Sequence, residues 1–177
     1  MDASVSAGGW FPPFVSGNAV QQTSTYSLTG LASYRYQLTP RGAVEGNYQY
    51  TQYSNKYVLS FLPNYRIHTR MQEASAAYVF TFPYKHLNPF IEGGVGGYLF
   101  TPLKDASSTD IYAIKTQTEV GALYGGGIAY EISPSFDIRA EYRGIIVKAP
   151  NFGLDYLKTN KYFWTVSNPV IGVAYHF

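Results

Sequence analysis

The sequence contains no cysteine, which excludes disulfide bonds, thiolate catalysis and cysteine-ligated metals. It also lacks any run of about 18 consecutive apolar residues, the length that a membrane-spanning helix needs, and this excludes a helical membrane protein. The formal net charge is only +2, which is too small to indicate a nucleic-acid partner. Residues 1–4 lack the basic and then apolar run of a secretion signal. Between a cytoplasmic protein and a mature chain with an added initiator methionine, we favour the second.

Aromatic residues and glycine are abundant instead. The chain has 18 Tyr, 11 Phe and 17 Gly, whereas charged residues make up only 14%. Tyrosine and glycine together indicate β-structure in which backbones approach closely. A length of 177 residues corresponds to a single domain and is sufficient for a small barrel.

Apolar and polar residues alternate with a period of two in eight segments, the pattern of β-strands. Most segments have about 10–14 residues, longer than the 5–6 typical of soluble strands and suited to crossing a bilayer at a tilt. The predicted strands are residues 3–11, 27–39, 43–53, 70–82, 90–101, 118–132, 136–147 and 163–177.

The connections between these segments alternate in length. Three are short and contain proline, and four are long. Short turns on one side and long loops on the other are typical of bacterial outer-membrane barrels. We therefore predict an all-β fold, an eight-stranded antiparallel up-and-down transmembrane β-barrel that forms a single domain over residues 1–177, with both termini on the short-turn side. The short connections are residues 40–42, 83–88 and 133–135, and the long loops lie near 12–26, 54–69, 102–117 and 148–162.

The two faces of the predicted strands differ in chemistry, since one is rich in tyrosine, valine and alanine and the other carries charges. All seven lysines lie in the predicted connections, whereas a solvated strand face would use lysine freely. Arginine suits an enclosed interior, because its guanidinium group satisfies two acceptors. We predict that the apolar face contacts lipid; the alternative is a soluble barrel with these aromatic residues in its core. The predicted lumen charges are Arg35, Glu45, Glu73, Glu92, Glu119, Arg139, Glu141 and Arg143.

The interior of an eight-stranded barrel is just wide enough for side chains, so charges there have to be paired. Two interpretations of the lumen charges stay open: a salt-bridge network that plugs the barrel, and a gate or polar path through it. Carboxylates outnumber arginines on this face, so some of them are expected to be hydrated, protonated or bound to a cation.

The segment "IGVAYHF", Ile171 to Phe177, places Gly172, Tyr175 and Phe177 at a spacing that resembles the C-terminal insertion signal of outer-membrane barrels. The resemblance implies recognition by the barrel-assembly machinery. Outward aromatic residues near the strand ends predict a girdle at each membrane interface. Its members are Tyr36, Phe80, Phe82, Phe90, Tyr130, Phe136, Tyr175 and Phe177 on the short-turn side, and Phe11, Tyr50 and Phe163 on the loop side.

A second resemblance covers the C-terminal half. "GALYGGGIAYEISPSFDIRAEYRGI", Gly121 to Ile145, resembles a strand–turn–strand hairpin of the OmpA-like barrel family, and "NPFIEGGVGGYLF", Asn88 to Phe100, resembles the glycine-rich strand before it. The resemblance implies a monomeric eight-stranded barrel in the outer membrane of a Gram-negative (diderm) bacterium. It covers the barrel only, so the peptidoglycan-binding role of the family's second domain is not expected.

The long loops carry more positive than negative charge. This excess predicts contacts with the phosphates of lipopolysaccharide and with the lipid of the outer membrane; the alternative is an ordinary solvated loop face. The cationic residues are Lys56, Arg66, Arg70, Lys104, Lys115, Lys148, Lys158 and Lys161, against Asp105, Asp110 and Asp155.

Signals for catalysis are weak. The three histidines form neither a His-Glu-x-x-His motif nor a His-x-Ser pair, and the glycine runs lack the frame of a phosphate loop. We expect no enzyme activity, cofactor or metal. The function predicted is a structural role in the envelope or an interaction role of the loops. The alternatives are a small channel for ions or hydrophobic solutes and, more remotely, a lipid-modifying enzyme.

Overall fold

The computed structural model describes residues 1–17, 20–59, 65–103, 115–153 and 163–177. These residues form ten β-strands. No helix in this part of the chain is long and apolar enough to cross a membrane. The strands are β1 (Asp2–Trp10), β2 (Val15–Gly17), β3 (Val20–Ser24), β4 (Ser27–Gln37), β5 (Gly42–Leu59), β6 (Tyr65–Thr81), β7 (Leu87–Leu103), β8 (Gln117–Ser133), β9 (Phe136–Lys148) and β10 (Phe163–His176).

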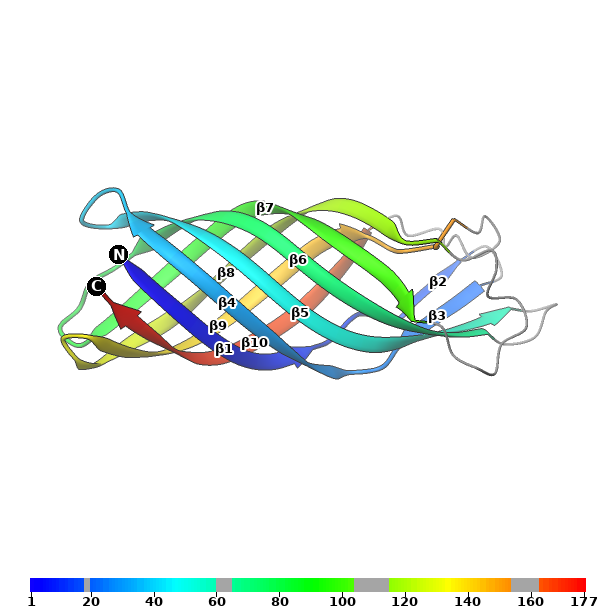
Figure 1. The fold of residues 1–177 in the computed structure, drawn as a ribbon, viewed down its shortest axis with the longest axis horizontal. Coiled ribbons are helices and arrows are strands. Elements are labelled where there is room, and N and C mark those ends of the chain that lie inside the picture. The colour runs from blue at the N-terminus through cyan, green and yellow to red at the C-terminus, as the bar shows by residue number, and fades with distance from the viewer. Residues whose placement is uncertain (18–19, 60–64, 104–114, 154–162) are drawn as a thin grey trace.

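Eight of these strands close into a barrel, which confirms the predicted fold class. Each strand pairs antiparallel with its neighbour in the order β5-β4-β1-β10-β9-β8-β7-β6, and β6 pairs back with β5. The barrel closes where β1 pairs with β10, from Asp2 opposite His176 to Gly8 opposite Val170. In Figure 1 the strands cross the long axis at a tilt, and both termini lie at the end with the short turns.

The remaining two strands, β2 and β3, form a hairpin at the opposite end, which we call the loop end (Figure 1). Strand β3 pairs with the outer part of β5, from Val20 opposite Leu59 to Ser24 opposite Asn55. The predicted loop near 12–26 therefore contains a hairpin. Residues 104–114 and 154–162, which make up most of the two later loops, lie outside the described residues.

The predicted loop near 54–69 is wrong in its bounds, because most of it belongs to strands β5 and β6. The ladder between them continues to Tyr57 opposite Tyr65. Both faces of this extension carry polar side chains, for instance Asn55 inside and Lys56 outside. The period-two contrast is lost there although the backbone pairing persists, since a strand beyond the hydrocarbon layer needs no apolar face.

The apolar face is on the outside of the barrel. The most exposed large apolar side chains at strand positions include Leu28, which is 84% exposed, Val120 at 75% and Val95 at 64%. On the same strands the polar residues of the opposite face, such as Arg35 and Glu92, are buried. The alternative of a soluble barrel with these aromatic and aliphatic residues in its core is therefore contradicted.

The interior has two halves of different chemistry. The half near the short turns contains the charged side chains, and the half near the loop end is filled by a cluster of buried apolar and aromatic residues that the sequence analysis did not predict. We call this cluster the apolar plug. Its largest members are Trp10, Tyr53, Tyr57, Met71, Tyr98, Phe100, Phe152 and Trp164.

The prediction that Phe90 belongs to the outward aromatic girdle is wrong. Phe90 is only 2% exposed and packs inside the barrel with Ala43 and Val79. It has the same parity as Glu92 along β7, so both side chains point inward. The Arg35 guanidinium lies 4.8 Å from the centre of the Phe90 ring. The ring therefore forms a cation–π contact with that arginine.

Candidate functional site in the barrel interior

The charged half of the interior begins with Arg35 on β4. Strand alternation turns its side chain inward, and the register places it directly opposite Glu45 on β5. Arg35 Nη2 lies 2.6 Å from Glu45 Oε2, and both side chains are almost completely buried. This pair therefore ties β4 to β5 by a close charge-assisted contact.

Arg139 on β9 extends the network across the seam where the barrel closes. Its Nη2 donates a hydrogen bond to Asp2 Oδ1 at 2.7 Å, and its Nη1 lies 3.8 Å from Glu45 Oε2. Asp2 was missed in the sequence analysis, where the first strand began one residue too late. Its period-two spacing from Ser4 and Ser6, which are also buried, was the signal that could have placed it on the inner face.

Arg143, four residues further along β9 and on the same inner face, is completely buried and contacts four side chains. Nη1 donates to Gln49 Oε1 at 2.6 Å and Nη2 donates to Glu73 Oε1 at 2.7 Å. Nε lies 3.4 Å from Glu141 Oε1 and 3.6 Å from Glu92 Oε1. Arg143 thus joins β5, β6, β7 and β9 near the middle of the barrel.

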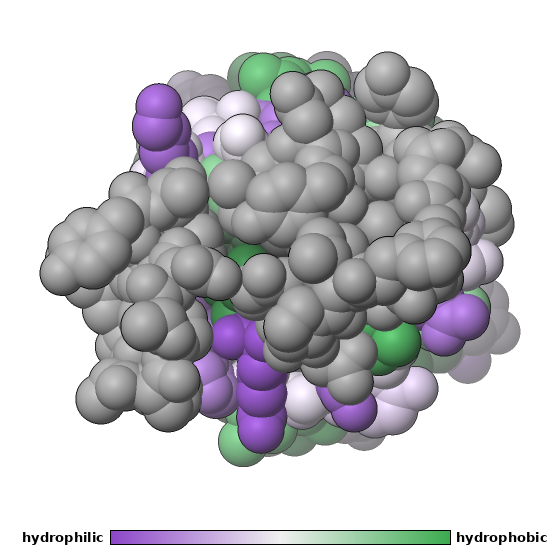
Figure 2. Space-filling view, turned by 90° about the vertical axis from the view of Figure 1, so that its right-hand side faces the viewer, coloured by the Kyte–Doolittle hydropathy of each residue, from purple (hydrophilic) through white to green (hydrophobic). Residues whose placement is uncertain are grey.

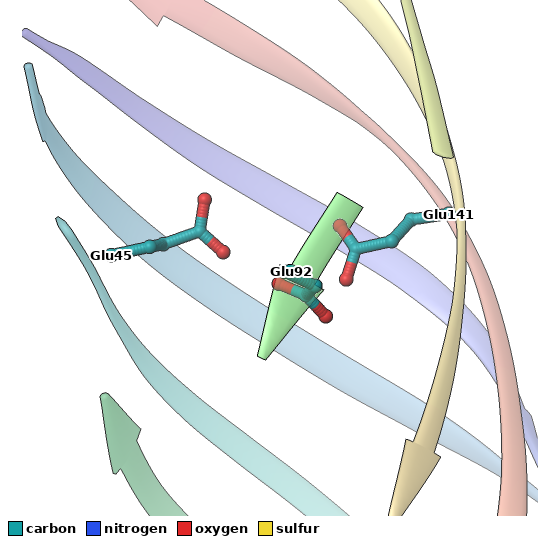
Figure 3. A group of neighbouring side chains, drawn as sticks. All are labelled: Glu45, Glu92 and Glu141. Carbon is teal, nitrogen blue, oxygen red and sulfur yellow. The ribbon is translucent and has the colours of Figure 1, made fainter. Parts of the chain in front are cut away.

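Within the described residues, this network contains three arginines and five carboxylates, so negative charges outnumber positive charges by two. Its acids are Asp2, Glu45, Glu73, Glu92 and Glu141. Three of them, Glu45, Glu92 and Glu141, each place a carboxylate oxygen within 4.8 Å of the others. Figure 3 shows these three carboxylates pointing toward one another from β5, β7 and β9. Such a group needs protons or a cation, because buried like charges repel strongly.

Glu119 is the one predicted lumen charge that lies away from this network. It is near the loop end of β8, where its Oε1 lies 3.7 Å from Lys148 Nζ and accepts a hydrogen bond from Gln117. At the opposite mouth, His176 Nε2 lies 2.8 Å from Asp137 Oδ2, a contact the sequence analysis did not predict. The seven other predicted lumen charges come together in the one network described above.

The residues of the predicted insertion signal lie on β10 and just beyond it. Tyr175 and Phe177 point outward and are in contact with each other, with ring centres 5.0 Å apart. Gly172 faces β1, where a Cβ atom would lie only 2.1 Å from Ser6 Oγ and 2.3 Å from the Val5 carbonyl oxygen. Any side chain at this position would force β1 and β10 apart at the seam.

The predicted cationic residues of the loops are partly described. Lys56 and Arg66 are exposed and directly opposite each other in the β5–β6 ladder, and Arg70 follows on β6. Lys115 is exposed, and Lys148 is the residue that forms the ion pair with Glu119. Figure 2 looks onto this end and shows hydrophilic side chains of the described part at its rim. The other three, Lys104, Lys158 and Lys161, lie outside the described residues.

A pocket on the outer wall near the loop end contains a Ser–His pair that the sequence did not reveal. Ser54 Oγ and His68 Nδ1 are 2.7 Å apart and share a hydrogen bond, and both line the pocket together with Tyr26 and Gln52. The two residues are 14 positions apart and face each other only because the β5–β6 ladder pairs them.

Two comparisons with known proteins found similarity. The family model for the outer membrane protein beta-barrel domain matches residues 4–177. A search of curated proteins found no match. Among solved structures, the chain resembles the outer membrane protein OprG of Pseudomonas aeruginosa, with 13% identity and a TM-score of 0.70 over 99% of this chain and 95% of that one.

Two further structures are similar. The Neisserial surface protein A, NspA, has 17% identity and a TM-score of 0.60 over 99% of this chain and 97% of that one. The attachment invasion locus protein Ail of Yersinia pestis, solved with the heparin analogue sucrose octasulfate, has 18% identity and a TM-score of 0.55 over 99% and 98%. At these identities the structures establish the fold, which agrees with the predicted resemblance to OmpA-like barrels.

Proposed function

The chain belongs to the family of outer membrane protein β-barrel domains, and on that premise we propose that it has a structural role in the envelope and that its loop end binds anionic partners. It is an outer-membrane protein of a Gram-negative bacterium. The observation that carries the structural role is the filled interior. Arg143 is completely buried in the charged half, and Trp10 and Trp164 are completely buried in the apolar plug.

The filled interior favours a closed barrel over the alternative of a channel. An ion entering from the short-turn mouth would meet the Arg143 network and then the apolar plug, where a charge loses its hydration. Recording from single barrels, refolded and inserted in a planar bilayer, tests this directly. We expect no steady openings. Reproducible, ion-selective openings would contradict the structural role and support the channel.

The proposal for the loop end rests on Lys56 and Arg66. Like charges directly opposite each other in a ladder destabilise it, unless an anion lies between or above them. Both side chains are exposed near the loop end of the β5–β6 ladder, the end that we propose faces the lipopolysaccharide leaflet. The solved structure of Ail contains a sulfated polyanion, and a ligand of that chemical class fits a pair of cations here. The pair of cations Lys56 and Arg66 is thus the proposed contact with lipopolysaccharide.

Binding of the purified barrel to lipopolysaccharide tests this proposal. Because a cation near an anionic membrane surface contributes about 1 kcal/mol, replacing Lys56→Gln and Arg66→Gln together should weaken binding about tenfold or more. The matched control is Arg41→Gln with Lys85→Gln, two exposed cations at the short-turn end. Equal affinities of the two double variants would contradict a specific role of Lys56 and Arg66.

We also propose that the protein is not an enzyme, is a monomer, and is inserted by the barrel-assembly machinery. The Ser54–His68 pair is the feature closest to catalytic chemistry, but Ser54 is only 6% exposed, which leaves its hydroxyl group little access to a substrate. A hydrogen bond that fixes the β5–β6 extension is the role that this geometry favours.

A further inference from the structure

We propose that Glu45, Glu92 and Glu141 form a binding site for one divalent cation of the size of calcium inside the charged half of the barrel. The three residues come from β5, β7 and β9, which are held apart by the closed ring of strands. Their carboxylates are directed toward one another inside it (Figure 3). Oxygen atoms of carboxylates are the ligands that hard divalent cations prefer.

The arrangement of the oxygen atoms suits calcium. One oxygen from each residue lies within 4.8 Å of the other two, so small side-chain movements bring all three to one ion. Calcium accepts irregular sets of protein oxygens at about 2.3–2.6 Å, whereas magnesium requires near-ideal octahedral geometry at about 2.0–2.1 Å and usually keeps several waters. A buried group of three carboxylates therefore favours calcium over magnesium.

The state of Glu92 points independently to a ligand. Its side chain has 0% exposure. Apart from the neighbouring carboxyl group of Glu141, no residue in the described part of the chain hydrogen-bonds to either of its oxygens. The only cationic contact found for it there is the long one of 3.6 Å from Arg143 Nε to Oε1. A completely buried carboxylate whose nearest polar neighbour is another carboxyl group is strongly disfavoured. In Figure 3 this carboxylate lies between those of Glu45 and Glu141, where an ion would satisfy it.

The charge of the network also matches a divalent ion. Its five carboxylates carry two more charges than its three arginines, so one divalent cation brings the described network to neutrality. Space for the Glu92 carboxylate comes from Gly125 on β8, the residue opposite it in the ladder. A Cβ atom at Gly125 would lie 2.8 Å from Glu92 Oε1.

Calorimetric titration of the full-length barrel with calcium chloride tests the proposal. The protein is refolded in an uncharged detergent, which does not itself bind calcium, and is washed with a chelator. We expect one ion per chain and a higher unfolding temperature in calcium than in chelator, because a ligand that binds only the folded state stabilises it. Replacing Glu92→Gln should weaken the affinity for calcium about tenfold or more. Loss of a residue that merely supports a metal ligand already has an effect of about that size, and loss of a direct ligand has a larger one.

Glu119→Gln is the matched control, since Glu119 is a half-buried glutamate outside the cluster, and it should bind calcium like the wild type. The proposal is overturned if the wild type binds no calcium, if Glu92→Gln binds as tightly as the wild type, or if magnesium binds more tightly than calcium. In the first case, protons rather than an ion neutralise the cluster. Should Glu92→Gln fail to refold, Glu141→Gln and the calcium dependence of the wild-type unfolding temperature decide the question in the same way.

Discussion

Arg143 has no exposed surface, and its guanidinium group contacts side chains from β5, β6, β7 and its own strand. Replacing Arg143→Met keeps much of the volume but leaves the carboxylates of Glu73 and its neighbours without their cation. Breaking a buried ion pair by removing one partner costs about 3–5 kcal/mol. We predict a loss of that size in the free energy of unfolding, measured by urea titration of the barrel in lipid vesicles.

Arg41→Met provides the control for this prediction. Arg41 is exposed in the turn between β4 and β5, so its replacement should change the free energy of unfolding by no more than about 0.5 kcal/mol. If both variants lost the same small amount, the arginine in the barrel interior would not hold the strands together as the contacts indicate.

Gly125 gives a second prediction for a single residue. A Cβ atom there would lie 2.5 Å from the Tyr142 carbonyl oxygen and 2.8 Å from Glu92 Oε1, so Gly125→Ala must displace one of them. Overpacking of this kind costs about 1–3 kcal/mol, to be measured by the same urea titration.

Gly30→Ala is the matched substitution outside the barrel, where a Cβ atom at Gly30 would meet no atom within 4 Å. It should alter the free energy of unfolding by less than about 0.5 kcal/mol. An equal cost at both glycines would show that the effect comes from the loss of glycine in a strand rather than from the crowded interior.

Strand β10 and the residue after it carry the predicted insertion signal, which a substitution at the end of this strand tests. Replacing Phe177→Ala removes the terminal aromatic ring, which we expect to slow assembly into the outer membrane in cells, because an edge strand is recognised through its backbone and its alternate side chains. The measurement is the folded fraction found in the outer membrane after a pulse of synthesis.

Phe136→Ala is the control for the C-terminal strand, since this ring is also exposed and lies against Tyr175, 5.1 Å away between ring centres. It removes a similar interfacial ring while leaving β10 intact, and should assemble at the wild-type rate. Comparable defects in the two variants would mean that the aromatic girdle, and not the end of the chain, determines assembly.

The strands could be predicted from the sequence wherever one face meets lipid and the other the interior, because only there does the period-two contrast hold. All eight barrel strands were recognised for this reason. The outer parts of β5 and β6 were missed because Asn55 and Lys56 make both faces polar. Backbone pairing alone produces no alternation of polar and apolar residues in the sequence.

The residues of the candidate site could be predicted to a similar extent, but their contacts could not. Inward parity identified the arginines and glutamates, and burial of the charges follows from the narrow bore. Their partners could not be read from the sequence, since Arg143 meets Glu73 only through the closed ring, 70 residues apart. The apolar plug was missed for a different reason: an inward aromatic residue such as Tyr98 has the same appearance in the sequence as an outward one.

For the whole molecule, the central claim is that the tyrosine- and valine-rich face is in contact with hydrocarbon while the charges are enclosed. Closure of the ring between β1 and β10 leaves no unpaired barrel edge, as a lipid environment requires. The apolar exterior then accounts for a barrel that is stable in a membrane, and the filled interior supports the proposal that it is closed to ions.

The most direct test uses the absence of native cysteine, which allows one spin label to be attached at Val95→Cys, in the middle of β7 and 64% exposed in the wild type. In lipid vesicles, collisions of the nitroxide with oxygen and with a water-soluble nickel chelate are compared. We predict high accessibility to oxygen and low accessibility to the chelate, the signature of contact with hydrocarbon. High accessibility to the chelate, or low accessibility to both reagents, would contradict the account, because Val95 would then face water or a protein core.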